Sequence, residues 1–302
     1  GTITKKEQGK ELSDLSGMSQ LGVHWFSDDG VGMNDQNLLR EAFEKGRQDN
    51  FIIACHTEDL KYRPQGGSVH DSKVVTEKGW IGISDACESE PLKNDLQTAL
   101  AVNGKYHACH ISSHLSVEAL REAKQKGGDV SAEVTVHHLL LEDKDVQGPM
   151  WKMNPPLRTH EDRMCLIEAL EDGTLDFIAN DHAPHTMRDK ARPMANSAFG
   201  IVSLETAFPL LYSEFVYRTK RWTLNQLVEW MSEKPAKRFG LNHVGKIEKG
   251  YTSDMFLVQL NQESMIDADT FESKGKNTPF NGWSVYAEIK QTIVNGKTVW
   301  KG

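Results

Sequence analysis

Short apolar runs alternate along the first 181 residues with segments in which apolar residues recur at helical spacing. The apolar runs predict strands at 22–29, 51–56, 106–112, 131–136 and 175–181. Helical spacing between them predicts helices at 37–48, 88–102, 116–128 and 159–173. Strands that alternate with helices in this way indicate a parallel sheet with crossover helices. The continuity of the apolar runs favours strands that are buried on both faces.

Capping residues define the ends of two of these helices. Ser116 is a plausible N-cap and Gly127 a C-terminal stop for the third helix. Thr159 and Gly173 have the same roles for the fourth. These residues predict where each helix begins and ends.

The last hundred residues have a different pattern. Two helices are predicted at 203–219 and 223–239, and strands follow at 251–260 and 291–300. Asn295-Gly296 within the last strand is a strong signal for a two-residue hairpin turn. We therefore expect a catalytic domain over residues 1–245 and a small β-sandwich domain over 246–302.

Polar side chains follow four of the five predicted strands at the point where each strand ends. The pair Asp28 and Asp29 ends the first, His56 the second, His110 the third and Asp181 the fifth. In a parallel α/β barrel the carboxyl ends of the strands converge on one face, where the active site lies. Imidazole and carboxylate donors are the ligands that a zinc-like divalent ion prefers. The shared position predicts a metal site.

Simpler explanations exist for individual residues. A lone histidine such as His56 is more often a hydrogen-bonded structural residue, and we assign that role to His24, His70, His160 and His243. Asp28-Asp29-Gly30 alone is a common turn. Alternation along the strands predicts that Cys55 and Cys109 are packing residues in the helix layer. The roles of His137 and His138, after the fourth strand, stay open.

Composition limits the class of protein. The 302 residues carry a net charge of -8 with both signs interspersed, which argues against nucleic acid as the main partner. No apolar stretch is long enough to cross a membrane, and residues 1–20 lack the apolar core of a signal peptide. The four cysteines show no CxxC spacing, which favours reduced thiols in the cytoplasm.

The chain resembles the bacterial type I dihydroorotases of the amidohydrolase superfamily. Their characteristic segments match this sequence at FSDDG (26–30), ACHTED (54–59), CHISS (109–113), AEVTVHHLLL (132–141), KMNPPLR (152–158), DFIANDHAPH (176–185), ETAFPLLY (205–212) and SKGKNTPFNGW (273–283). The resemblance implies a metal-dependent (β/α)8 TIM-type barrel with a small β-sandwich appendage, of which strands four to eight are present. It also implies a cytoplasmic enzyme of pyrimidine biosynthesis. Its expected reaction is the reversible hydrolysis of dihydroorotate to N-carbamoyl-aspartate.

The resemblance also implies roles for single residues. Asp29 would bridge two zinc ions, with His56 and His110 on one ion and Asp181 on the other. Asp181 would take the proton of the attacking water and return it to the leaving nitrogen. Asn154 and His185 would contact the substrate. We also expect a homodimer, and a carbamoyltransferase for aspartate is a possible partner.

One family feature is missing from the sequence. The family pattern has an N-terminal HxH pair that completes the metal site, and no HxH occurs in this chain. We therefore expect these residues to be the C-terminal part of a longer enzyme, to hold one zinc ion or none where the complete enzyme holds two, and to be inactive alone. The alternatives are an inactive scaffold and another cyclic amidohydrolase, such as a hydantoinase or an allantoinase.

Overall fold

A computed structural model describes all 302 residues as two compact units. The first unit comprises Gly1–Val146 and Pro155–Asp176, and the second comprises Gln147–Asn154 and Phe177–Gly302. The division at residue 245 expected from the sequence stays a prediction. None of the helices is both long and apolar enough to span a bilayer.

Four parallel strands form the core of the first unit. They lie in the order β1 (Trp25–Phe26), β2 (Ile52–Cys55), β5 (Tyr106–Ala108) and β6 (Val130–Thr135). Each is shorter than its predicted apolar run except β6. A separate parallel pair consists of β3 (Val69–His70) and β4 (Gly82–Ile83).

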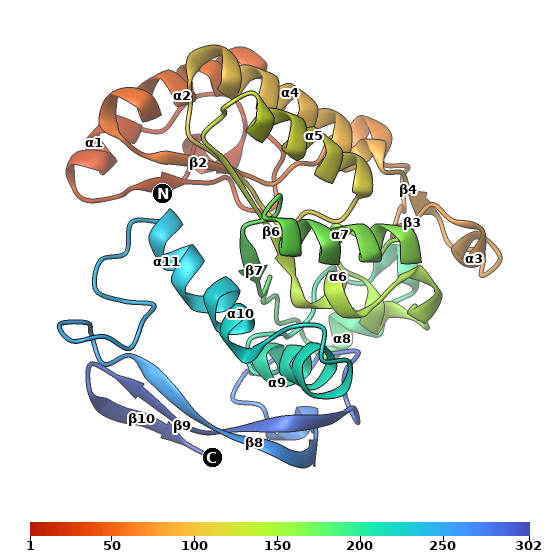
Figure 1. Ribbon diagram of the computed structural model, residues 1–302. Coiled ribbons are helices and arrows are strands. Elements are labelled where there is room, and N and C mark those ends of the chain that lie inside the picture. The colour runs from red at the N-terminus through yellow and green to blue at the C-terminus, as the bar shows by residue number, and fades with distance from the viewer. The chain divides into compact units, whose positions relative to one another are not determined.

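Helices connect and cover these strands. They are α1 (Leu15–Gln20), α2 (Gln36–Asp49), α3 (Lys73–Thr76), α4 (Ala86–Val102), α5 (His114–Gln125), α6 (Val136–Leu140) and α7 (His160–Asp172). α4 packs between α2 and α5, and α5 packs against α7 (Figure 1). The apolar face of α2 is buried through Leu39, Ala42 and Phe43, as its helical spacing predicts.

Helix ends test the capping assignments directly. Thr159 caps α7 in a capping box with Asp162, and Gly173 closes it in the left-handed conformation, so both predictions are confirmed. The N-cap assigned to Ser116 is wrong. α5 begins earlier, because the side chain of Ser113 accepts the backbone N–H of Leu115. Gly127 follows the end of α5 with a φ of 81°, as expected of a stop residue.

The longer segment of the second unit, Phe177–Gly302, begins with β7, which is the fifth predicted strand. Its elements are β7 (Phe177–Ala179), α8 (Met187–Lys190), α9 (Ala207–Leu211), α10 (Leu224–Val228), α11 (Lys234–Arg238), β8 (Met255–Met265), β9 (Ser284–Val294) and β10 (Lys297–Lys301). The two predicted helices each contain a π-helical segment, at Tyr212–Arg218 and Glu229–Glu233. α9 packs against β9.

The C-terminal strands form an antiparallel sheet in the order β10-β9-β8 (Figure 1). β9 and β10 are joined at Asn295 and Gly296, whose φ values are 50° and 72°. Positive φ at both central residues is the requirement of the type I′ turn. The predicted hairpin is confirmed.

Candidate metal centre

Three of the predicted ligands lie together in the first unit. His56 directly follows β2, and His110 lies two residues after β5. Nδ1 of His56 lies 2.6 Å from Nε2 of His110, and Nε2 of His56 lies 3.5 Å from Oδ1 of Asp29. The parallel pairing of β2 with β5 produces this approach, since it aligns the ends of the two strands.

The two adjacent aspartates have different environments. Asp28 is buried and accepts hydrogen bonds from the backbone N–H and the hydroxyl of Thr4. The side chain of Asp29 is 89% exposed and is directed to His56. Asp28 therefore has a structural role, and Asp29 is the carboxylate available to a metal ion.

The histidine pair suits a cation. Burial, and then the neighbouring His110, lower the pKa of His56 to about 4. The ring is therefore neutral at pH 7, the form that binds metals. Nδ1 of His110 is buried without a hydrogen-bond partner, and such an atom is expected to serve an ion, a water molecule or a function. Two imidazoles and one carboxylate are a donor set that fits zinc.

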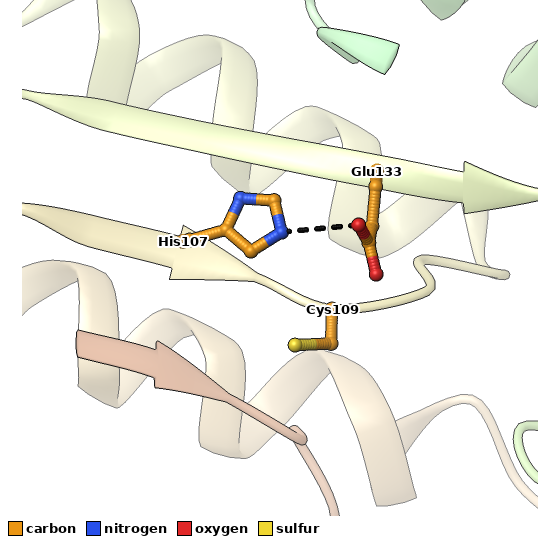
Figure 2. Close-up of side chains that lie close together, drawn as sticks. All are labelled: His107, Cys109 and Glu133. Atoms are coloured by element: carbon orange, nitrogen blue, oxygen red, sulfur yellow. Dashed lines mark ion pairs between the residues drawn. The ribbon is translucent and has the colours of Figure 1, made fainter. Parts of the chain in front are cut away.

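The backbone at His110 is held in an unusual conformation. His110 has a φ of 35°, in the left-handed region that residues with a side chain rarely adopt. The next residue, Ile111, donates its N–H to the carbonyl of Glu133 at 2.8 Å. Burial raises the pKa of the Glu133 carboxyl, but hydrogen bonds from His107 (Figure 2) and from the His110 backbone outweigh it, and the net pKa is lowered. The ionised Glu133 thus stabilises the turn that presents His110.

A buried ion-pair network holds the loop that follows His110. Glu88 accepts the backbone N–H groups of Ser112 and Ser113 at 3.1 Å each. Arg158 lies 3.5 Å from Glu88 and donates to the Ser112 hydroxyl at 2.8 Å. Burial raises the pKa of the Glu88 carboxyl. The positive charge of Arg158 has the largest opposing effect, and the net pKa is lowered. The network fixes the loop without occupying the metal centre.

Arg158 also accounts for a second group of potential ligands. His70, Asp85 and Asp162 offer donor atoms within 4.8 Å of one another. The Arg158 guanidinium lies 3.0 Å from Asp85 and 3.2 Å from Nδ1 of His70. A cation is therefore already present in the form of the arginine, so this group is structural.

The histidines left open after the fourth strand are both buried. His138 has a structural role, because its ring nitrogens lie 2.6 Å from the Thr135 hydroxyl and 3.2 Å from the Pro155 carbonyl. His137 is fully buried, and neither of its ring nitrogens has a hydrogen-bond partner. Burial lowers its pKa well below the ordinary value, so the ring is neutral.

Asp181 lies in the second unit, two residues after β7. Its φ is 45°, so this predicted ligand also has a left-handed backbone. The loop around it is anchored on both sides. The hydroxyl of Ser203 donates to the Asn180 carbonyl at 2.5 Å, and Nδ1 of His182 accepts the N–H of Ser203 at 3.2 Å. His182 is thereby structural.

The predicted substrate contacts His185 and Asn154 are half-buried residues of the same unit. The buried side chain of Asn277 accepts the His185 N–H at 2.8 Å and donates to the carbonyls of Ala183 and Gly200 at 3.0 Å. Asn277 thus connects the Asp181–His185 loop to residue 200. Asn277 lies in the matching segment 273–283, but no local signal in the sequence predicts this role.

Two buried lysines hold the segment beside Asn154. Nζ of Lys152 donates to the carbonyls of Met194 and Ser197 at 2.7 and 2.8 Å. Nζ of Lys190 donates to the carbonyls of Lys152, Ala198 and Gly200 at 3.0 Å each. Burial, and then the charge of Lys152, lower the pKa of Lys190 to about 8.

Comparison with known proteins identifies the family. The model of the amidohydrolase family matches residues 4–299. The chain belongs to the amidohydrolase family. Members of this family depend on metal ions. The dihydroorotase of Bacillus licheniformis is 47% identical over 304 residues, and that of Bacillus caldolyticus is 46% identical over 301. Each match covers 99% of this chain and 70% of the relative, which confirms the resemblance to dihydroorotases.

Solved structures confirm the fold class. The L-hydantoinase of Arthrobacter aurescens superposes with a TM-score of 0.82 at 26% identity, over 95% of this amidohydrolase and 66% of that chain. The dihydropyrimidinase of Brevibacillus agri gives a TM-score of 0.82 at 22% identity, over 95% and 65%. The chain thus spans just under two thirds of these structures. The fold is that of the amidohydrolase (β/α)8 barrel, with a separate antiparallel sheet.

Proposed function

We propose that the protein is a dihydroorotase, to which these residues contribute part of the active site: it catalyses the reversible hydrolysis of the cyclic amide of dihydroorotate to N-carbamoyl-aspartate in pyrimidine biosynthesis. The observation that carries the proposal is the 46–47% identity to curated dihydroorotases over 99% of the chain. The approach of Asp29, His56 and His110 supports it, because that donor set suits the metal chemistry of the family.

The residues have distinct roles in this proposal. Asp29, His56 and His110 would hold a zinc ion, and Asp181 is a further carboxylate that we propose as a metal ligand. When bound, the metal supplies Lewis-acid chemistry, polarising the amide carbonyl and lowering the pKa of water. Asp181 accepts the proton from water and delivers it to the leaving nitrogen. His185 and Asn154 bind and orient the substrate.

The surroundings of the reaction are part of the same proposal. We place the enzyme in the cytoplasm as a homodimer that acts on a small molecule. A carbamoyltransferase that acts on aspartate is a candidate partner, because its product, N-carbamoyl-aspartate, is the compound that the reverse reaction cyclises. The alternative from another class of protein is an inactive scaffold that binds no metal.

Hydantoin-type hydrolysis is a second candidate, favoured by the TM-scores to a dihydropyrimidinase and an L-hydantoinase. The identities of 22% and 26% to those proteins are well below the 46–47% to dihydroorotases. We therefore rank dihydroorotate first.

A substrate panel tests the proposal. The full-length protein that contains these 302 residues is loaded with zinc and assayed with dihydroorotate, hydantoin and allantoin. We expect turnover of dihydroorotate and of N-carbamoyl-aspartate in the reverse direction. Turnover of hydantoin or allantoin without dihydroorotate would overturn the assignment, and absence of both metal and activity would favour the scaffold.

A further inference from the structure

Lys190, the last residue of α8, has a buried ammonium group that is surrounded by backbone carbonyls. The residue is 1% exposed. Its Nζ donates to the carbonyls of Lys152, Ala198 and Gly200 at 3.0 Å each. An ammonium group has three N–H donors, so these bonds use all of them. None is left for a substrate, and the role of the group is to hold the backbone.

The charged form of Lys190 is the one that fits these three carbonyls. Burial, and then the charge of Lys152, lower the pKa of Lys190 to about 8, so the side chain is mainly protonated at pH 7. A neutral amine has two N–H donors and a lone pair, and that lone pair would face one of the carbonyl oxygens. A buried carbonyl without a donor is unfavourable, so the site is matched to the ammonium.

One contact of Lys190 fixes the segment that leads to Asn154. The Lys152 carbonyl accepts Nζ of Lys190 at 3.0 Å and the backbone N–H of Gly200 at 2.9 Å. Two donors occupy both lone pairs of this carbonyl. Asn154, a proposed substrate contact, lies two residues further along the chain, so its position depends on both bonds.

A second contact of Lys190 fixes the loop that carries His185. The Gly200 carbonyl accepts Nζ of Lys190 and Nδ2 of Asn277 at 3.0 Å each, and Asn277 in turn accepts the N–H of His185 at 2.8 Å. Gly200 also lies directly against this loop. A Cβ atom at position 200 would come 2.4 Å from Cβ of Ala183 and 3.4 Å from Nε2 of His185. A displacement of residue 200 would therefore be transmitted to His185.

We propose that Lys190 is a positioning residue for substrate binding, because its ammonium group ties together the backbone segments that present Asn154 and His185. The inference rests on the proposed function, in which these two residues contact the substrate. Asp181 is held by a different contact, since the hydroxyl of Ser203 donates to the carbonyl of the residue before it. Loss of the ammonium group should therefore weaken substrate binding more than it slows the chemical step.

The test is Lys190→Met in the zinc-loaded full-length protein. Methionine is unbranched and apolar and suits a buried position, but it donates no hydrogen bond. We expect KM for dihydroorotate to rise between about tenfold and a hundredfold, as misplacement of a contact can produce, while kcat changes by less than about threefold. KM does not depend on the fraction of folded protein, so a merely structural role would leave it unchanged. Lys249→Met, at an exposed lysine of the same unit, is the matched control and should keep the parent KM.

Hydrogen exchange tests the same contacts without a substrate. In Lys190→Met that circular dichroism shows to be folded, we expect faster exchange at the amides of Gly200 and His185, whose acceptors belong to Lys152 and Asn277. If this variant does not fold, Lys190→Gln replaces it, because glutamine keeps two N–H donors without the charge.

The outcomes separate this inference from the proposed function. An unchanged KM in the folded variant, a fall in kcat alone, or parent-like exchange at both amides would overturn the role of Lys190. If the parent turns over hydantoin or allantoin instead of dihydroorotate, the proposed function fails, and KM for that substrate tests Lys190. If the parent turns over none of the three, the exchange measurement alone decides.

Discussion

Nδ1 of His56 lies 2.6 Å from Nε2 of His110, although the residues are 54 positions apart in the chain. The contact depends on two features that act together. The parallel pairing of β2 with β5 aligns the strand ends, and the left-handed backbone of His110 turns its side chain after the strand has ended. Two imidazole nitrogens at this distance can share a proton or a metal ion, so the pair should govern metal affinity.

Substitution of one member of the pair should therefore weaken metal binding. We expect His56→Ala to lower zinc affinity at least about tenfold, as loss of even an outer-shell partner does. Isothermal titration calorimetry measures the change. His24→Ala, at an exposed histidine, is the matched control and should bind like the parent. Equal zinc affinity in the parent, His56→Ala and His24→Ala would show that the His56–His110 pair is structural.

Substitution of Asp181 should separate catalysis from folding. Asp181→Asn keeps the shape of the side chain but removes its ability to accept a proton, so we expect the rate with dihydroorotate to fall by about two to four orders of magnitude. The assay uses the zinc-loaded full-length protein. Asp269→Asn, at an exposed aspartate of the same unit, should leave the rate unchanged. Near-normal turnover by Asp181→Asn would remove its proposed role.

Local signals in the sequence predicted much of the fold. Thr159 and Gly173 were identified as helix ends because capping depends on residues within one helical turn. Asn295-Gly296 was identified as a turn for the same reason. The N-cap of α5 was misplaced because Ser113 and Ser116 satisfy the same local rule, and only the structure shows which hydroxyl accepts an N–H.

The environment of the site was less accessible to sequence analysis. Ligand positions could be predicted, because strand ends meet at one face of a barrel. The roles of Glu133 and Asn277 could not, because each acts on residues more than twenty positions away in the chain. The one signal for Glu133 in the sequence was its own charge, which interrupts the apolar run of β6. The left-handed backbones of His110 and Asp181 had no sequence signal, since neither residue is glycine.

A buried carboxyl in the first unit should make stability depend on pH. Asp95 on α4 accepts hydrogen bonds from Gln36 at 3.1 Å and Tyr106 at 3.2 Å. Burial raises its pKa from 3.8 to about 7, although both hydrogen bonds act in the opposite direction. Between pH 4 and 7 the unfolded chain has released this proton while the folded chain retains it. The free energy of unfolding should therefore fall as pH rises through this range.

Substitution with asparagine tests this dependence. Asp95→Asn keeps one acceptor oxygen and replaces the other oxygen with an N–H donor, as the protonated carboxyl does with its O–H. It cannot ionise, so we expect a flatter stability profile between pH 4 and 7. The difference has an upper limit of roughly 4 kcal/mol, at about 1.4 kcal/mol for each pKa unit. Urea denaturation at a series of pH values measures it. Glu122→Gln, at an exposed carboxylate, is the control and should follow the parent profile. An identical profile for Asp95→Asn would show that Asp95 is ionised in the folded chain.

Asn277 should be the residue that holds the Asp181–His185 loop in place. Its side chain makes three hydrogen bonds to backbone groups, and Asn277→Ala would leave those groups without their partner. Each unsatisfied buried group costs about 1–3 kcal/mol, so we expect a loss of a few kcal/mol in unfolding free energy and faster hydrogen exchange at the amides of Ala183 and His185. Asn281→Ala is the matched control, because Asn281 lies in the same segment but makes one such bond, to the N–H of Ala268. If both substitutions cost the same and exchange at 183–185 is unchanged in Asn277→Ala, the loop is held by other contacts.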